Sequence, residues 1–434
     1  MSFREYINQI DEKGLLRKVD VNVSKKLEIS GILKEIEPTQ VIFNNIKESE
    51  FRVAGNIFCT KNVIASYFGV TPADLIPMLS KAITHRSKPE IITDAPCQEI
   101  IEPSVDLDKL PILLHCEKDG GNYISSAVVI TRDPDYGQNM DFHRAMQLSK
   151  DKFATRIVSG RHFHKFLEKN GELEVAFCIG NTPNILIAGA TSVDIGVDEL
   201  EIANALEAIK VVKARSVDLL IPAEAEFVLE GRVFMEERHP EGPFVDLTET
   251  YDVVREEPVF EVKKITHRKE AIWQALLPGA LEHKILMGMP REPTIFNKVN
   301  ETGVKCLDVN ISPGGSSWLH AIVKIDKKSD EDGKKAIDGA FLGHTSCKHV
   351  FIVDKDIDIY DPLSVEWAMA TRFQGDVGMV IKDKEPGSSL DPSAEPGTKM
   401  TTKIGFDLTK PLIAKGKSFD KADFPAIDID KYIK

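Results

Sequence analysis

The stretch YISSAVVITRDP, residues 123–134, decides the fold prediction because it joins apolar and β-branched residues to a terminal Asp-Pro pair. Such a run predicts a short buried strand, and the proline marks its end. Similar runs, bounded by Gly, Pro, Asn or Asp, recur at 175–183 (VAFCIGNTP), 184–191 (NILIAGAT) and 217–234 (VDLLIPAEAEFVLEGRVF). We therefore expect the middle of the chain to be a β-rich core of the kind that forms a barrel.

One helix is expected inside this β-rich core, at residues 198–212. Ile202, Leu206 and Ile209 fall on one helical face there, and Asp198 stands where an N-cap residue is needed. The core therefore contains a few helices among its strands.

Helices and strands alternate on both sides of the core. A helix follows Ser2 as its N-cap, and the other flanking elements are predicted as strands at 40–46, 51–58, 306–313, 319–326 and 349–354 and helices at 72–83 and 362–373. Such alternation is typical of α/β domains. Because 434 residues exceed one typical hydrophobic core, the length predicts two or three domains, and we place three at residues 1–108, 109–300 and 301–434.

Composition excludes several classes of protein. The 55 basic and 68 acidic residues give a net charge of −13, which argues against broad nucleic-acid binding. The sequence shows neither a signal peptide nor an apolar run long enough to cross a bilayer. Its cysteines lack the paired spacing of a disulfide framework or a zinc site, at positions Cys59, Cys97, Cys116, Cys178, Cys306 and Cys347. We therefore expect a cytoplasmic protein that binds no membrane.

Common catalytic fingerprints are missing from the sequence, which has no G-x-G-x-x-G, Walker A, G-x-S-x-G or H-E-x-x-H motif. Three scattered residues, Asn139, His162 and Glu199, together offer an amide oxygen, an imidazole and a carboxylate. Such a mixed shell suits Mn²⁺ or Mg²⁺. Each residue also has an ordinary explanation, since Glu199 would stand in the first turn of a helix, where the dipole favours acids. Spacing alone leaves both interpretations open.

A second group combines two acids with an arginine. In HPEGPFVDL (239–247), Glu241 and Asp246 flank a rigid Gly-Pro pair. Arg144 is a natural bidentate partner for a substrate carboxylate, although it could also form an ordinary surface ion pair. Two acids near one arginine can hold different protonation states, which suits proton transfer.

Motifs spread over nearly the whole chain resemble the UbiD family of decarboxylases, which use prenylated FMN. NMDFHR (139–144) matches an Asn-x-x-x-x-Arg signature of that family, and EGPFVD (241–246) matches its Glu-Gly-Pro-Phe-x-acid signature. Further segments resemble the family at 3–20, 110–134, 221–231, 356–372 and 403–410. The combination is far more specific than any one of its elements.

The resemblance implies a role for each residue of both groups. Asn139, His162 and Glu199 would hold Mn²⁺ (or Mg²⁺) against the cofactor phosphate, with a potassium-like ion beside it. Arg161 and Lys403 would contact the cofactor, with Lys399 as a rival to Lys403. The catalytic network would be Glu241, Arg144 and Asp246: Arg144 holds the carboxylate, Asp246 returns a proton, and Glu241 fixes Arg144.

Two features of this chain depart from the signatures of some relatives. His143 precedes the arginine, and Arg161 precedes the metal histidine where some relatives carry glutamine. The chain resembles the archaeal branch most, including His143, and that branch acts on trans-anhydromevalonate 5-phosphate to give isopentenyl phosphate and CO₂ in the archaeal mevalonate pathway. His143 and Arg161 would then either meet the substrate phosphate or support the metal shell.

Two other functions remain open. One is decarboxylation of a 4-hydroxy-3-polyprenylbenzoate or another aromatic acid, and the other is a flavin-free, metal-dependent binding or hydrolytic protein. The resemblance further implies a central split β-barrel of the flavin-reductase type between two α/β domains. It also implies a prenyl-flavin synthase as cofactor supplier, and a homodimer or trimer of dimers joined through C-terminal elements.

Overall fold

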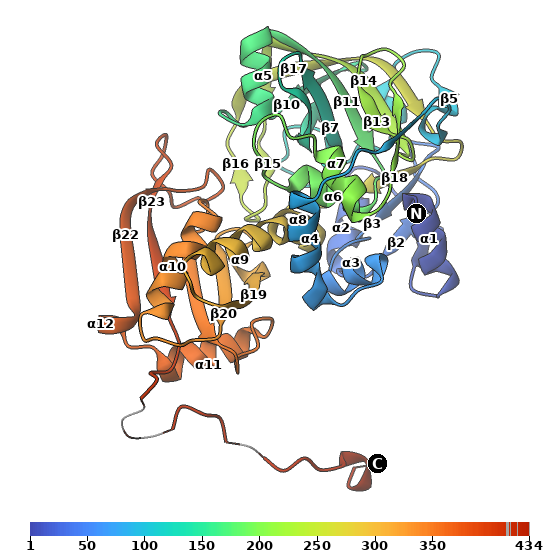
Figure 1. The fold of residues 1–434 in the computed structure, drawn as a ribbon. Coiled ribbons are helices and arrows are strands. Elements are labelled where there is room, and N and C mark those ends of the chain that lie inside the picture. Colours follow the sequence, from blue (N-terminus) through green and yellow to red (C-terminus); the bar gives the residue numbers. More distant parts are fainter. Residues whose placement is uncertain (414–415, 417, 423, 434) are drawn as a thin grey trace.

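The computed structural model describes residues 1–413, 416, 418–422 and 424–433. A nine-stranded antiparallel sheet occupies the middle of the chain, in the order β6-β9-β10-β17-β14-β11-β7-β8, with β5 added to β17 (Figure 1). Its strands are β5 (Ile100–Ile101), β6 (Tyr123–Ile124), β7 (Val128–Asp133), β8 (Gly137–Phe142), β9 (Ala145–Gln147), β10 (Lys152–Thr155), β11 (Glu172–Ile179), β14 (Phe227–Glu241) and β17 (Arg255–His267).

The sheet curls but does not close. Among the described strands, its end strands β6 and β8 do not pair with each other, so the expected barrel is an open sheet. Bulges bend the long β14–β17 pair near Gly231 and Phe234, and such bulges increase the local twist. Gly231 is required there, because a Cβ atom would lie 1.9 Å from the carbonyl oxygen of Glu261. The mixed multidomain fold predicted from the sequence is confirmed.

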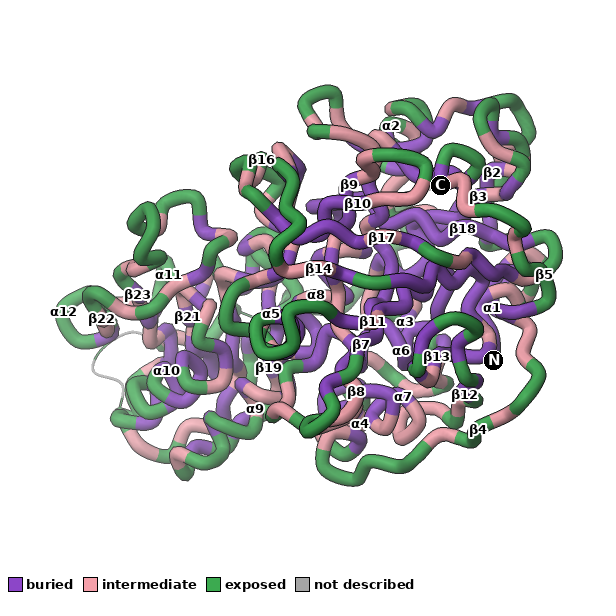
Figure 2. Tube along the Cα trace, turned by 90° about the horizontal axis from the view of Figure 1, so that it is seen from above, coloured by how far each residue is buried: buried purple, intermediate pink, exposed green. Residues whose placement is uncertain are grey.

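The hydrophobic core runs along the middle strands of this sheet. Figure 2 shows buried residues along β11 and β17, and the first half of β14 is buried as well. On one face, the ring of Phe260 stacks on Phe177 at 4.5 Å and on Phe153 at 6.0 Å. All three side chains are fully buried, and burial of each such ring contributes about 1.5–3 kcal/mol to folding.

Three helices pack around the central sheet: α5 (His162–Asn170), α6 (Pro183–Ala190) and α7 (Glu199–Leu206). The structure corrects the strand predicted at 184–191, which is helix α6. Pro183 begins that helix, where its missing N–H costs nothing. Every residue of α6 is buried, so its sequence lacks the alternation of apolar and polar residues that distinguishes a helix from a strand. Helix α7 begins at the predicted place, and the Asp198 side chain accepts the N–H of Leu200 as its cap. It is shorter than predicted, because it ends at Leu206 and residues Lys210–Lys213 form strand β12.

The N-terminal region forms a four-stranded sheet, β1-β2-β3-β18, with helices around it. Its elements are β1 (Arg17–Val19), β2 (Val41–Phe43), β3 (Arg52–Gly55), β18 (Ile272–Ala275), α1 (Phe3–Glu12), α2 (Glu28–Glu35), α3 (Lys61–Phe68) and α4 (Leu75–Thr84). Ser2 caps α1 as predicted, in a capping box with Glu5. A separate small sheet has the order β13-β12-β4, with β4 (Glu90–Ile92), β12 (Lys210–Lys213) and β13 (Leu220–Pro222).

The C-terminal region is a five-stranded sheet, β19-β20-β21-β23-β22, packed between helices. Its elements are α9 (Glu292–Glu301), β19 (Cys306–Ile311), β20 (His320–Ile325), α10 (Asp332–Gly343), β21 (His349–Asp354), α11 (Pro362–Arg372), α12 (Gly375–Gly378), β22 (Met379–Pro386) and β23 (Met400–Asp407). Helix α8 (Leu281–Gly288) and the 3-10 turn η4 (Met289–Arg291) lead into α9, and together they join this region to the rest (Figure 1).

The sheets exchange strands across the boundary expected at residue 108. Strand β18 returns to the N-terminal sheet, while β4 and β5 pair with strands of the middle region. The three-domain division therefore stays a prediction. Among the described residues, no single helix has the length and apolar character of a membrane span. One pair, α3 with Pro72–Thr84, meets those criteria only jointly and is bent by 81°.

Candidate active site

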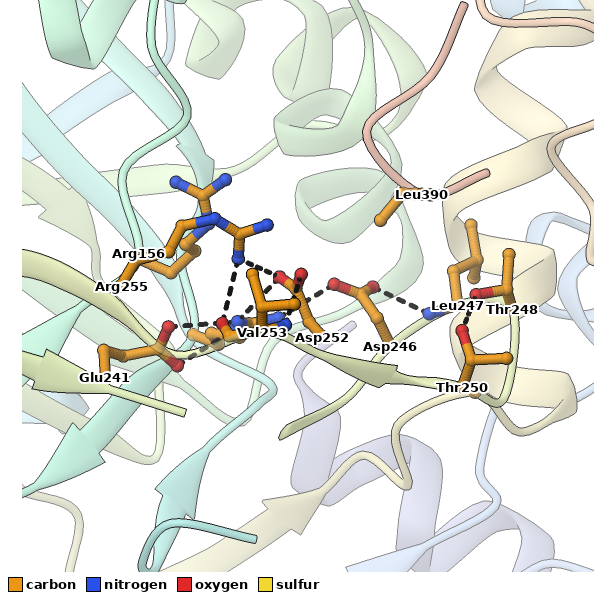
Figure 3. A network of polar contacts seen from close by, with 12 residues as sticks. Arg156, Glu241, Asp246, Leu247, Thr248, Thr250, Asp252, Val253, Arg255 and Leu390 are labelled. Carbon is orange, nitrogen blue, oxygen red and sulfur yellow. Dashed lines mark hydrogen bonds and ion pairs between the residues drawn. The ribbon is translucent and has the colours of Figure 1, made fainter. Parts of the chain in front are cut away.

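Arg144 is the centre of a buried network of charges. It lies between β8 and β9, and its guanidinium donates to three carboxylates. Nε and Nη2 donate to the two oxygens of Glu241 at 2.9 and 3.0 Å, Nη1 donates to Asp246 at 2.8 Å, and Nη2 donates to Asp252 at 3.0 Å. Figure 3 shows the three carboxylates converging on one place. The structure thus brings Glu241, Arg144 and Asp246 together.

The Gly-Pro spacer explains how two acids close in sequence reach one guanidinium. Glu241 ends the long strand β14, and the chain turns at Gly242, where φ is 106°. Strand β15 (Phe244–Val245) then pairs with β16 (Tyr251–Asp252), which brings Asp246 and Asp252 to the same side of the arginine. The turn packs closely, since a Cβ atom on Gly120 would lie 2.2 Å from the carbonyl oxygen of Gly242.

Aromatic and polar neighbours hold the network in place. The Tyr123 hydroxyl donates to Glu241 at 2.9 Å, so both oxygens of this fully buried carboxylate have partners. The ring of Phe244 lies 5.2 Å from the Arg144 guanidinium and 4.0 Å from the Tyr123 ring. Arg255 donates to Asp252 at 2.6 Å. Two arginines therefore face three carboxylates. The network carries one excess negative charge, which a bound proton would neutralise.

The network shifts the acidity of its members. Burial alone would lower the pKa of Arg144, but the carboxylates of Glu241, Asp246 and Asp252 outweigh it and raise that pKa. Burial raises the pKa of Asp252, but Arg255 and Arg144 outweigh that effect and hold it below its usual value. Both residues therefore stay ionised at neutral pH. Asp246 is the most exposed of the three acids, with 22% of its side chain accessible against 14% for Asp252 and 0% for Glu241.

Asn139, His162 and Glu199 also lie together, on β8, at the start of α5 and at the start of α7. Asn139 Oδ1 and His162 Nδ1 are 3.2 Å apart, and the N–H of Met140 donates to Glu199 Oε2 at 2.7 Å. Burial raises the pKa of Glu199 well above its usual value, and Asn139 Nδ2 is buried without a partner among the described residues. A cation among these three groups would neutralise Glu199.

The other residues named from the sequence divide into two kinds. Lys403 is buried and donates to the carbonyl oxygen of Thr345 at 2.5 Å, whereas its rival Lys399 is exposed. Arg161 is exposed at the N-terminus of α5. His143 is buried, with Nδ1 2.9 Å from the carbonyl oxygen of Arg156 and Nε2 2.9 Å from Asp141. Both ring nitrogens of His143 face protein groups, which favours the supporting role over contact with substrate.

Sequence reasoning missed three residues of this site. Asp252 and Tyr123 contact the network directly, but they reach it only through pairing of β16 and β6, and neither has a motif of its own. His283 is the third, on α8. Burial lowers its pKa, while the charge of Asp246 acts in the opposite direction. Its Nδ1 accepts the N–H of Gly279 at 3.0 Å.

Three family models match consecutive parts of the chain. They describe the N-terminal, Rift-related and C-terminal domains of 3-octaprenyl-4-hydroxybenzoate carboxy-lyase, and they match residues 7–83, 90–281 and 284–408. The chain belongs to the UbiD family. The Asn139–Arg144 and Glu241–Asp246 segments both lie within the Rift-related match.

Relatives within the UbiD family resemble the chain along its whole length. The anhydromevalonate phosphate decarboxylase of Methanocaldococcus jannaschii is 40% identical over 429 residues, which cover 97% of this chain and 99% of the relative. The UbiD-class enzyme HmfF from Pelotomaculum thermopropionicum, solved with FMN, has a TM-score of 0.95 at 33% identity, with 100% of both chains covered. An evolved dimeric form of HmfF, solved with prFMN, has a TM-score of 0.91 at 32% identity, with the same coverage.

Proposed function

We propose that this protein is a prenylated-FMN-dependent decarboxylase that converts trans-anhydromevalonate 5-phosphate to isopentenyl phosphate and CO₂. The observation that carries this proposal is the Arg144 network, in which a guanidinium stands among three carboxylates. The substrate assignment draws on the 40% identity to the anhydromevalonate phosphate decarboxylase of M. jannaschii.

The residues present fit a phosphorylated flavin held through a divalent ion. Asn139, His162 and Glu199 supply an oxygen, a nitrogen and a carboxylate, and the buried Glu199 lacks a cationic partner among the described residues. Mn²⁺ or Mg²⁺ suits this set of ligands, and the proposal includes a potassium-like ion beside it. Lys403 is available for the cofactor phosphate. When bound, the flavin supplies the electron sink that decarboxylation at an unsaturated carbon requires.

Arg144 would bind the substrate carboxylate by exchanging one of its present partners. Asp246 is the natural one to leave, because it is the most exposed of the three acids and makes a single hydrogen bond to the guanidinium. Glu241 keeps its two bonds and so holds Arg144 in place. Asp246, once released from the guanidinium, would then deliver a proton to the carbon from which CO₂ departs.

Production of the protein together with a prenyl-flavin synthase, which would supply the cofactor, gives the direct test. We expect CO₂ release from trans-anhydromevalonate 5-phosphate and little or none from 4-hydroxybenzoates. Turnover of an aromatic acid without turnover of the phosphorylated acid would move the protein to the aromatic branch. Purified protein that binds no flavin would contradict the decarboxylase proposal and favour a flavin-free metal protein. A cytoplasmic location remains part of the proposal and can be checked by cell fractionation.

A further inference from the structure

Three cations that lack carboxylate partners in the described part of the chain lie around His344. Arg291 lies in η4, Lys403 in β23 and Arg161 at the start of α5. Among the described residues, none of them has a carboxylate oxygen within 4.0 Å of its charged group. All three act on one neighbour, because burial lowers the pKa of His344 to about 3 and the charges of Arg291, Lys403 and Arg161 act in the same direction. His344 is therefore neutral, and the cluster carries three positive charges.

Arg291 is the most constrained of the three. Its Nη2 donates to the carbonyl oxygen of Ala190 at 3.1 Å, and its guanidinium lies 5.2 Å from the ring centre of Trp318. Its Nε is shielded from solvent and has no hydrogen-bond partner among the described residues. Burial, together with the charge of Arg161, lowers the pKa of Arg291 to about 10. Arg291 is half-buried, and a shielded Nε donor without a partner in the described structure, beside a second cation, is costly unless an anion binds there.

Helix α8 and turn η4 connect this cluster with the Arg144 network. His283 lies near the start of α8, and the charges of Asp246 and Arg144 both act on its pKa. Arg291 follows eight residues later, which corresponds to about 12 Å along a helix axis. One short ligand with an anionic group at each end could therefore contact Arg144 at one end and Arg291 at the other.

We propose that Arg291 binds the phosphate of the substrate, with Arg161 as a second cation, while Arg144 holds the carboxylate at the opposite end. This inference rests on the proposed function, and it names the residue that selects acids carrying a phosphate monoester. The planar guanidinium fork suits two phosphate oxygens, and its unused Nε provides the free donor. Lys403 remains with the cofactor phosphate.

The test measures binding to protein loaded with FMN. The proposed reaction requires the prenylated flavin, so the FMN-loaded protein should bind the substrate without converting it. Calorimetry compares trans-anhydromevalonate 5-phosphate with the acid that lacks the phosphate. We expect Arg291→Gln to weaken binding of the phosphorylated acid by about 10- to 100-fold and binding of the other acid less than twofold. Arg291→Lys keeps the positive charge but loses the planar guanidinium. Its affinity for the phosphorylated acid should therefore lie between those of the wild-type and Arg291→Gln proteins. Arg132→Gln, an exposed arginine paired with Asp218, is the matched charge control and should change neither.

Several results would overturn the inference. If Arg291→Gln weakens FMN binding but not riboflavin binding, Arg291 contacts the cofactor phosphate instead. If it weakens both acids equally, or lowers thermal stability without changing either affinity, its role is structural. Unchanged binding of both acids, or a wild-type protein that does not bind the phosphorylated acid, would also overturn it. A different result separates the two proposals: Arg291-dependent binding without CO₂ release by the prenylated-FMN holoenzyme contradicts the proposed function and keeps the inference.

Discussion

Arg144 makes four hydrogen bonds to carboxylates, and the three acids differ in how firmly they are held. Glu241 is fully buried and accepts from both Arg144 and Tyr123. Asp252 is shared between Arg144 and Arg255. Asp246 is held by Arg144 and by the N–H of Leu247. Asp246 makes one hydrogen bond to one arginine and has no second side-chain partner among the described residues, so it is the acid suited to move and to carry a proton.

Asp246→Asn should separate proton delivery from binding. The amide cannot deliver a carboxyl proton, so we expect kcat for CO₂ release to fall by about 100- to 10,000-fold. Flavin content should not change, because Glu241 still fixes Arg144. Asp252→Asn keeps the same shape, leaves Asp246 intact and should lower kcat much less. Normal turnover by Asp246→Asn would remove Asp246 from proton transfer, and equal losses in both variants would show that only the charge of the network matters.

Glu199→Gln should remove the response of flavin binding to a divalent ion. The amide cannot supply the negative charge that compensates the ion, whereas the buried carboxylate of Glu199 can. We expect Mn²⁺ to strengthen FMN binding to the wild-type protein, chelation to reverse that gain, and neither to affect the variant. Flavin fluorescence during titration measures this. Glu201→Gln in the same helix turn is the matched control, and identical behaviour of the two variants would exclude Glu199 as a metal ligand.

At the scale of elements, Asp133 connects the β7–β8 hairpin with helix α5, the two elements that carry Asn139 and His162 of the candidate metal site. It ends β7 and accepts from Lys169 at 2.9 and 3.0 Å and from Asn170 at 2.7 Å, near the end of α5. Strand β8, which follows, carries Asn139, and α5 begins at His162. Burial opposes ionisation of Asp133, but hydrogen bonds from Lys169, Asn170 and two backbone N–H groups hold its pKa at about 2.

Asp133→Ala should lower the free energy of unfolding by about 1–3 kcal/mol at pH 7, because the partners of a buried carboxylate lose their acceptor. The lowered pKa fixes the sign of the pH dependence. The contribution of Asp133 is present above about pH 4 and is lost as the pH falls toward 2. Urea unfolding of both proteins between pH 7 and pH 3 measures the difference. If the difference in the free energy of unfolding between the two proteins does not shrink toward low pH, the ionised carboxylate of Asp133 is not its cause.

The elements also show which parts of the fold the sequence could predict. The strands at 123–134 and 217–234 and the start of the helix after Asp198 follow from local patterns, whereas the predicted end of that helix is strand β12. Helix α6 could not be distinguished, because all its residues are buried. Whether the sheet closes depends on pairing between distant strands, which no local pattern encodes. For the same reason Glu241 and Asp246 could be proposed from one short segment, whereas Asp252 could not.

At the scale of the whole molecule, the C-terminal region must keep its place beside the middle region for Lys403 and Arg291 to act on the same ligands as Arg144. One contact that holds it is a buried ion pair across the N- and C-terminal regions. Lys61 of α3 donates to Glu292 of α9 at 2.6 and 2.7 Å, and Glu292 also accepts the N–H of Ile311 at 3.0 Å. Glu292 immediately follows Arg291, so this ion pair also positions the guanidinium of the phosphate site.

Glu292→Ala should therefore weaken both the fold and the site. It leaves Lys61 without its partner in a site where only 12% of the lysine side chain is exposed, and we expect a loss of about 3–5 kcal/mol in the free energy of unfolding. Binding of the phosphorylated acid to FMN-loaded protein should weaken as well, because α9 no longer holds η4 in place. Glu301→Ala on the same helix, where the acid is exposed and paired only with Lys298, is the matched control and should cost less than 1 kcal/mol. Replacing both partners, as Lys61→Met with Glu292→Leu, should recover much of the stability, since the uncompensated charge is then gone. Equal stability of the Glu292→Ala and Glu301→Ala proteins in urea unfolding would show that the ion pair does not hold the regions together.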